Sequence, residues 1–237
     1  MSQTEWLWSP QPPLALPVKS ISAGYPVNRL FFIGRNYLAH ALEMGAGAVD
    51  KAATQPFYFT KSPSSLVMSG VTVPYPLATN NYHHEIELVV ALGGGGVELS
   101  VSEAEKLVYG YACGLDMTRR DLQHTAKSKG LPWDTAKDCE QSAVVSEIVP
   151  MGNLGILRQG AIRLEVNGEV RQSADLSQLI WDIPEVIADL SRYYHLQAGD
   201  LIFTGTPEGV GPVRAGDVLT GMIEGVGSIR LCIAASN

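Results

Sequence analysis

The stretch YHHEIELVVALG, residues 82–93, decides how the body of this chain folds. Residues 84–92 are rich in apolar and β-branched side chains and predict a strand. Because side chains alternate between the two faces of a strand, Glu85 and Glu87 must point the same way. Two neighbouring carboxylates repel each other, and burying them together is costly unless a cation neutralises them. The alternative is a solvated strand face, which the adjoining apolar run disfavours.

Strand-like composition recurs elsewhere in the chain, with Ser, Pro, Gly and Asn between the segments. The segments are residues 30–33, 57–60, 66–73 and 111–115. The 24 glycines and 14 prolines predict many turns, so we expect a mainly β protein with some helix, of the α+β class. The stretch AGDLIFTGTPEGVG (198–211) is echoed by AGDVLTGMIEGVG (215–227). Two copies predict adjacent sheet segments in a barrel-like body, since a solenoid requires at least three repeats.

The bulk composition bounds the domain organisation and the classes of partner. A chain of 237 residues with 46% hydrophobic and 17% charged residues can bury a substantial core in one domain. We expect an extended N-terminal arm over residues 1–27, which lacks periodicity, and a catalytic domain over residues 28–237. The net charge of -7 comes without any basic cluster, so no nucleic-acid partner is expected.

The sequence also bears on location. Glu5 and the prolines at 10, 12 and 13 do not fit a secretion signal, and no apolar run approaches the ~20 residues of a membrane span. Cys113, Cys139 and Cys232 are odd in number and widely spaced, which favours reduced thiols. We therefore expect a soluble cytoplasmic protein without a membrane partner.

A third carboxylate, Asp116, follows the apolar segment 111–115. An acid at the end of a buried strand often lies in a cleft, although Asp116 alone serves equally well as the cap of the next helix. Three oxygen ligands from two strands suit Mg²⁺, Mn²⁺ or Ca²⁺ and leave coordination positions for a substrate. Zn²⁺ is disfavoured because no His or Cys cluster has zinc-site spacing. The pattern predicts a divalent-metal site at Glu85, Glu87 and Asp116, with Mg²⁺ as the first candidate.

Two helices carry further polar residues. Asn36 can cap a short helix that runs to about Met44, and on it His40 and Glu43 lie three residues apart on one face. A lone histidine is more often a surface residue, but a carboxylate able to orient the imidazole favours a general base. Thr118 is expected to begin a polar helix that Gly130 ends. Glycine spacing gives no phosphate loop or dinucleotide fingerprint, so no nucleotide cofactor is indicated.

Six motifs follow one another over nearly the whole body, from about residue 30 to 232. They are GRNYLAHALEMG, YFTKS, YHHEIELVVALG, GLDMTRRDLQ, KGLPWDTAKD and FTGTPEGVGP. Together they resemble the fumarylacetoacetate hydrolase family. The short chain and the GLPW loop are more similar to the bacterial fumarylpyruvate hydrolases and the acylpyruvases than to the longer fumarylacetoacetate enzyme. The resemblance implies a mixed β-sandwich roll that is usually dimeric.

The resemblance also implies roles for individual residues. Glu85, Glu87 and Asp116 match the family's metal ligands, in agreement with the alternation argument. The positions that match its water-activating pair are His40 and Glu43. Those that match its contacts to an oxo-acid substrate or its enolate are Arg120, Gln123, Lys137 and Thr206, with Lys61 as a weaker candidate.

The expected function is therefore metal-dependent hydrolysis of a carbon–carbon bond in a small 2-oxo acid. The first candidate is an acylpyruvate, fumarylpyruvate, which gives fumarate and pyruvate. On the same scaffold, oxaloacetate decarboxylation or isomerisation and decarboxylation of an oxo-heptenedioate also require enolate stabilisation. The retention of His40 and Glu43 favours hydrolysis. A non-catalytic binding protein is the third alternative, and the complete set of acids, base and lysine argues against it.

Overall fold

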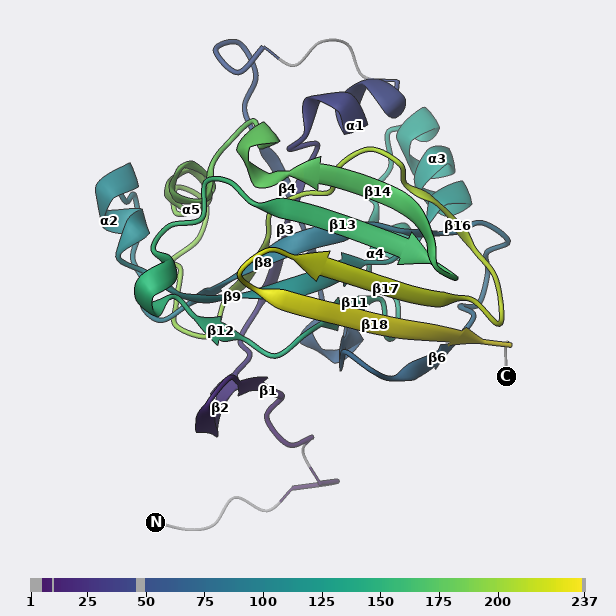
Figure 1. Cartoon of the computed structure of the whole chain (residues 1–237), viewed down its shortest axis with the longest axis horizontal. Helices are drawn as coiled ribbons and strands as arrows, with labels where there is room; N and C mark the ends of the chain where they lie inside the picture. Colours follow the sequence, from purple (N-terminus) through teal and green to yellow (C-terminus); the bar gives the residue numbers. More distant parts are fainter. Residues whose placement is uncertain (1–5, 10, 46–49, 236–237) are drawn as a thin grey trace.

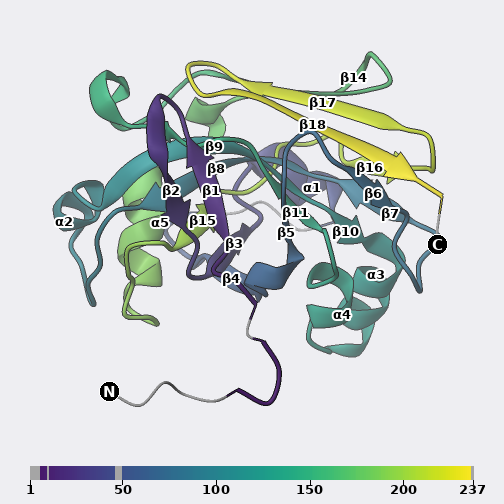
Figure 2. The ribbon, with the colours of Figure 1, turned by 90° about the horizontal axis from the view of Figure 1, so that it is seen from below.

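The computed structural model describes residues 6–9, 11–45 and 50–235, so the calls on residues 1–5 and 10 lie outside it. Two sheets pack face to face, and in Figure 1 the green and yellow strands lie in front of the blue and teal ones. Helices lie at both ends of this sandwich, as Figure 2 shows. The predicted α+β class, with strands dominant, is confirmed.

The larger sheet is mixed and holds the strands that carry Glu87 and Asp116. Its order is β4 (Phe57–Lys61), β3 (Leu30–Gly34), β15 (Leu201–Phe203), β8 (Ile86–Leu92), β9 (Val108–Asp116), β11 (Ala143–Val145) and β5 (Leu66–Met68), and β12 (Val149–Pro150) pairs with β9. The pairs β3–β15 and β5–β11 are parallel, whereas β8 is antiparallel to both of its neighbours.

The smaller sheet covers one face of the larger one. Its order is β14 (Glu169–Asp175), β13 (Ala161–Val166), β17 (Val218–Ile223), β18 (Gly227–Ala234) and β6 (Thr72–Pro74). A short three-stranded sheet joins β10 (Thr118–Arg119), β7 (Tyr82–His84) and β16 (Gly211–Val213), and a hairpin joins β1 (Ala15–Val18) and β2 (Ile21–Pro26).

Short helices complete the described part of the chain. They are α1 (Leu38–Glu43), α2 (Val101–Glu105), α3 (Arg120–Lys129), α4 (Asp134–Lys137) and α5 (Ile183–Leu190), with 3-10 turns at Pro63–Ser65, Gly152–Leu154 and Leu176–Gln178. In Figure 2, α3 and α4 lie together at one end of the molecule and α2 and α5 at the other. Across these described residues no helix has the length and apolar character to cross a membrane.

Alternation along β8 divides the core in two. Ile86, Leu88 and Val90 point into the main core between the two sheets, together with apolar side chains of β13, β17 and β18. Val89 and Ala91 point to the opposite face, where the hairpin β1–β2 covers a second apolar cluster. The cysteines Cys113, Cys139 and Cys232 are free thiols, as expected. The division of the chain at residue 28 stays a prediction.

Two of the expected strands are interrupted. The strand predicted over residues 84–92 breaks at Glu85, which separates β7 from β8. The strand predicted over residues 66–73 is divided between two sheets, because Gly70 turns the chain in the left-handed region at φ 96°. Strand β5 thus ends in the larger sheet and β6 begins in the smaller one.

Two further expectations are wrong in detail. The duplicated stretches are not adjacent in one sheet, because β15 lies in the larger sheet and β17 in the smaller one. Residue Thr118 does not begin the polar helix; it pairs with His83 in a sheet, and α3 begins two residues later. The end of this helix is as expected, since Gly130 caps it at φ 63°.

Gly114 supplies a test of the packing beside the carboxylates. It pairs with Glu87 across β8 and β9, and a Cβ atom there would lie 2.4 Å from Val89 Cγ2. We expect Gly114→Ala to lower the free energy of unfolding by about 1–3 kcal/mol, the usual cost of overpacking, in urea titrations. Gly211→Ala is the control, since its added Cβ would make only an ordinary contact at 3.5 Å. Equal stability of the two variants would contradict this account.

Candidate active site

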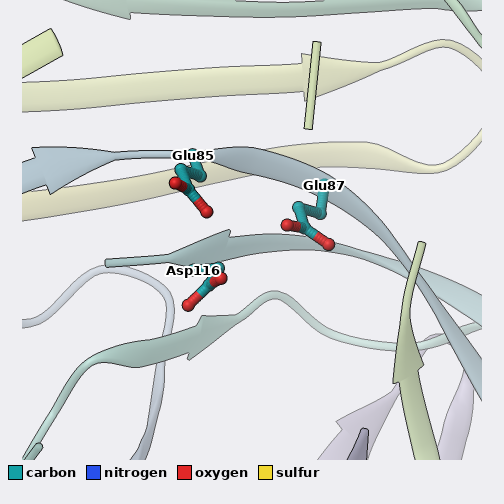
Figure 3. A group of neighbouring side chains, drawn as sticks. All are labelled: Glu85, Glu87 and Asp116. Atoms are coloured by element: carbon teal, nitrogen blue, oxygen red, sulfur yellow. The ribbon is translucent and has the colours of Figure 1, made fainter. Parts of the chain in front are cut away.

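Three carboxylates converge where β7, β8 and β9 meet (Figure 3). Glu85 occupies the break between β7 and β8, Glu87 lies two residues later on β8, and Asp116 ends β9. The ladder brings Asp116 beside Glu85, whose carbonyl accepts a bond of 2.9 Å from the Asp116 amide. One oxygen from each side chain lies within 4.8 Å of the others, and all three residues are buried. The predicted cluster is therefore present as a geometric unit.

Three cationic side chains from other elements contact two of these carboxylates. Lys137 Nζ lies 2.7 Å from Glu85 Oε2 and 2.5 Å from Asp116 Oδ2. The Arg120 guanidinium donates to Glu85 Oε1, and Lys61 Nζ lies 2.7 Å from Asp116 Oδ1. The last contact is an ion pair whose angle falls outside hydrogen-bond geometry. The charges of Glu85 and Asp116 are therefore compensated by cationic side chains that other elements supply.

The pKa directions follow from these contacts. Burial by itself would raise the pKa of Glu85, but Lys137 and Arg120 hold it well below its usual value. Burial works against the ammonium of Lys137, yet Asp116 and Glu85 raise its pKa above the ordinary value. Glu85 is thus an anion and Lys137 a cation at neutral pH.

Glu87 is in a different situation. Its Oε2 accepts a bond of 2.7 Å from the Gly205 amide, and no Lys, Arg or His of the described ranges forms an ion pair with it. Burial, together with the charges of Asp116 and Glu85, raises its pKa well above the usual range. A divalent cation among the three carboxylates would offset the cost of burying an ionised Glu87 beside them. An all-oxygen donor set suits such an ion. Glu85, Glu87 and Asp116 therefore fit a divalent metal.

The histidine on α1 faces the same site. His40 is buried, and its Nδ1 lies 3.1 Å from Glu43 Oε2, so the expected pair on one helical face is present. Burial lowers the pKa of His40, while the charges of Glu85 and Glu43 act in the opposite direction. The imidazole is neutral at pH 7, and with Nδ1 bonded to a carboxylate its Nε2 lone pair is available. Helix α1 starts after Tyr37 rather than Asn36.

A glycine-rich loop after β15 holds both parts of the site. The Gly205 amide donates to Glu87, and the Gly209 amide donates to Glu43 Oε1 at 3.1 Å. Both glycines have positive φ, and a Cβ at Gly209 would lie 2.0 Å from the Arg171 carbonyl oxygen. Only glycine satisfies both demands here. Thr206 lies between them and accepts a bond of 2.8 Å from the Gln172 amide.

One cavity brings most of the predicted residues together. Its lining includes the three carboxylates together with His40, Arg120, Gln123, Lys137 and Thr206. Lys61 does not line this cavity. Its ammonium is enclosed by Asp116, Ser142 and the Met117 carbonyl, so its contacts are those of a residue that fixes Asp116.

Several lining residues were not expected from the sequence. They are Arg35, Met44, Phe57, Phe59, Lys127 and Trp133. Arg35 and Trp133 stand in two of the motifs quoted above, GRNYLAHALEMG and KGLPWDTAKD, but strand and helix spacing assign neither a role. Lys127 lies on α3 and carries no sequence signal beyond its place in that helix.

Comparison with known proteins gives consistent matches. The family model described as fumarylacetoacetate hydrolase, C-terminal, matches residues 29–234. A fumarylpyruvate hydrolase of Ralstonia sp is 60% identical over 185 residues, which cover 78% of this chain and 96% of that protein. A mitochondrial oxaloacetate decarboxylase of Dictyostelium discoideum is 36% identical over 199 residues, covering 84% and 89%.

A solved structure extends the similarity to three dimensions. The crystal structure of fumarylpyruvate hydrolase from Pseudomonas aeruginosa in complex with Mn²⁺ and pyruvate superposes with a TM-score of 0.93. Its sequence is 43% identical, and the match covers 98% of this chain and 100% of that one.

Because Glu87 has no cationic partner, metal binding should change the thermal stability of the protein through this residue. Glu87→Gln replaces a buried carboxyl group that has no cationic partner with a neutral amide, so the metal-free variant should melt at least as high as the wild type. Addition of Mn²⁺ should raise the melting temperature of the wild type but not of Glu87→Gln, since a ligand that binds only the folded state stabilises it. Mn²⁺ calorimetry should give an affinity lower by at least about 100-fold in the variant. The exposed Glu169→Gln is the control, and a full Mn²⁺ response in Glu87→Gln would contradict the assignment.

Proposed function

This chain belongs to the fumarylacetoacetate hydrolase family, and we propose that it hydrolyses an acylpyruvate, fumarylpyruvate, to fumarate and pyruvate. It is a hydrolase that acts on a carbon–carbon bond. The observation that carries the proposal is that His40, which contacts Glu43, lines the same cavity as the carboxylate cluster. The name of the Ralstonia relative supports the choice of substrate.

His40 acts as the general base in this proposal. Glu43 accepts a hydrogen bond from Nδ1–H of His40 and is itself fixed by the Gly209 amide, so the imidazole keeps one tautomer and one orientation. Its Nε2 takes a proton from a water molecule, and the oxygen of that water attacks the acyl carbonyl carbon. The bond between that carbon and C3 of the pyruvyl unit then breaks, and His40 returns the proton to C3.

The departing group is the enolate of pyruvate, and the cavity cations stabilise it. Lys137 and Arg120 are held by Glu85 and Asp116 before the substrate arrives, so little reorganisation is needed as negative charge develops. Gln123 receives a bond of 2.5 Å from Arg120 and lines the cavity as a further polar contact. Thr206 also lines the cavity, and its hydroxyl accepts a bond from Gln172.

Glu85, Glu87 and Asp116 are the residues that would hold the metal, for which we propose Mg²⁺. When bound, a divalent cation supplies Lewis-acid polarisation of the 2-oxo acid and charge for the enolate. The complex of the related fumarylpyruvate hydrolase with Mn²⁺ supports a divalent ion. The three carboxylate side chains and the raised pKa of Glu87 are the features of this chain that agree with it.

Decarboxylation of oxaloacetate is the second candidate, because a relative 36% identical carries that name. Both reactions pass through an enolate, which the same cluster stabilises. Only hydrolysis requires an activated water, and the orientation of His40 by Glu43 favours it.

The remaining parts of the proposal concern assembly and location. We propose a homodimer in the cytoplasm, on the basis of the family resemblance and the high apolar content. A non-catalytic binding role is disfavoured, since a passive protein has no need of a base and an orienting carboxylate beside the cluster.

One variant with two substrates separates hydrolysis from decarboxylation. We expect His40→Ala to lower the rate of fumarylpyruvate cleavage by about 10²-fold or more, the usual contribution of a general base. Any oxaloacetate decarboxylation should be much less affected, because it needs no attacking water. His124→Ala, an exposed histidine of α3, is the control. Intact fumarylpyruvate cleavage with collapsed oxaloacetate turnover in His40→Ala would favour the decarboxylase.

The pH dependence follows from the direction of the His40 shift. Because burial lowers the pKa of His40, the base stays unprotonated below its ordinary value of about 6.5, and kcat/KM should fall only below that pH. Glu43 raises the pKa of His40, so Glu43→Gln should move the acidic limb to lower pH while it reduces kcat. An acidic limb above pH 6.5 in the wild type, or one that Glu43→Gln moves upward, would exclude His40 as this base.

A further inference from the structure

Two cationic side chains in the cavity have no role in the mechanism above. We propose that Arg35 and Lys127 form a second anion subsite that binds the distal carboxylate of a dicarboxylic acylpyruvate. The inference rests on the proposed function and deepens it, since such a subsite would select dicarboxylic over monocarboxylic substrates.

Arg35 and Lys127 approach the cavity from different elements. Arg35 directly follows the end of β3 and has a positive φ of 61°. Lys127 lies in the last turns of α3, half-buried. Both line the same cavity as Glu85, Glu87 and Asp116.

An aromatic wall carries both cations. The Arg35 guanidinium lies 5.6 Å from the ring centroid of Phe57, and Lys127 Nζ lies 5.1 Å from that of Trp133. The two rings meet edge to face at 5.5 Å. Cation–π contacts hold a positive charge without neutralising it, so each cation keeps its capacity to bind an anion.

The cations of the carboxylate cluster differ in this respect. Lys61, Lys137 and Arg120 each contact Glu85 or Asp116. In the described ranges, Arg35 and Lys127 form no ion pair, and Arg35 Nε is buried without a hydrogen-bond partner. A buried donor of a charged group that lacks an acceptor is costly, and a ligand carboxylate would satisfy it.

The local electrostatics point the same way. Burial, with Arg35 and Arg120 nearby, lowers the pKa of Lys127 to about 8. An anion between Arg35 and Lys127 would remove the repulsion and hold Lys127 as an ammonium. The surroundings of Lys127 are therefore those of a cation that lacks its counter-ion.

The charge balance of the whole cavity favours a dianion. Its lining carries three carboxylates and the four basic side chains of Arg35, Arg120, Lys127 and Lys137. A divalent cation adds further positive charge. A substrate with one carboxylate leaves much of this positive charge uncompensated. In a dicarboxylate, one carboxylate can compensate the metal ion and the other can compensate Arg35 and Lys127.

Binding of two matched ligands tests the subsite without turnover. The probes are 2-oxoheptanedioate and 2-oxoheptanoate, which share a 2-oxo acid head and differ only in a distal carboxylate or methyl group. Neither has a 4-oxo group to hydrolyse. In calorimetry with Mg²⁺-saturated protein, we expect the dicarboxylate to bind the wild type at least about 10-fold more tightly, in line with charged hydrogen bonds.

The variants assign that preference to the two residues. Lys127→Met and Arg35→Met should each remove most of the preference, and Lys127→Arg should retain it. The control is Lys129→Met, which removes the same charge from an exposed position of α3 and should change nothing. Should Arg35→Met fail to fold, Lys127→Met on the half-buried helix face tests the subsite alone. Equal binding of the two probes to the wild type, or a preference that survives Lys127→Met, overturns the proposal.

Kinetics distinguish failure of the subsite from failure of the proposed function. Fumarylpyruvate and crotonylpyruvate differ in the same way, by a distal carboxylate or methyl group. We expect Lys127→Met to lower kcat/KM for fumarylpyruvate by about 10- to 100-fold and to leave that for crotonylpyruvate unchanged. Equal losses on both substrates contradict the subsite. A wild type that cleaves neither substrate, yet prefers the dicarboxylic probe, refutes the hydrolase and retains the subsite.

Discussion

The burial of three carboxylates within 4.8 Å of one another is the constraint to which the rest of the site responds. Removing such charges from water is costly, and their mutual repulsion adds to the cost. Lys61, Lys137 and Arg120 compensate Glu85 and Asp116, but they leave Glu87 with a backbone amide alone. The charge compensation of the cluster is therefore uneven, and a divalent cation would stabilise the carboxylate of Glu87 most.

The loop after β15 links this cluster to the histidine. Gly205 and Gly209 donate to Glu87 and Glu43, so a metal-ligand candidate and the orienting carboxylate of the base depend on one loop conformation. Asn36 strengthens the link, since its side chain bonds to the carbonyl oxygens of Trp181 and Thr204 just before α1 begins. The positions of Glu87 and Glu43 thus depend on backbone amides of the same loop.

Local periodicity made part of this site predictable. Alternation is enough to bring Glu85 and Glu87 together, and helical spacing is enough to pair His40 with Glu43, because both rules act within a few residues. The interruption of the strand at Glu85 and the division of residues 66–73 between two sheets were not predictable, since they depend on which sheet each segment joins. The same holds for Lys61: its sequence position gives no sign that Asp116 and Ser142 enclose its ammonium. Arg35 and Lys127 line one cavity only because the end of β3 and helix α3 both reach it, although more than ninety residues of chain separate them.

The arrangement separates the two chemical tasks between different elements. The cations and carboxylates on β8, β9, α3 and α4 suit stabilisation of an enolate, whatever reaction produces it. In the proposed mechanism, activation of water is the task of His40 on α1, a helix of six residues outside the sheets. Loss or displacement of the His40 imidazole would remove hydrolysis and leave the enolate-stabilising cluster in place. A scaffold built in this way can support both hydrolysis and decarboxylation, which agrees with relatives that carry either name at 60% and 36% identity. In the mechanism proposed above, the bond of 3.1 Å between His40 and Glu43 is therefore the feature that favours hydrolysis in this chain.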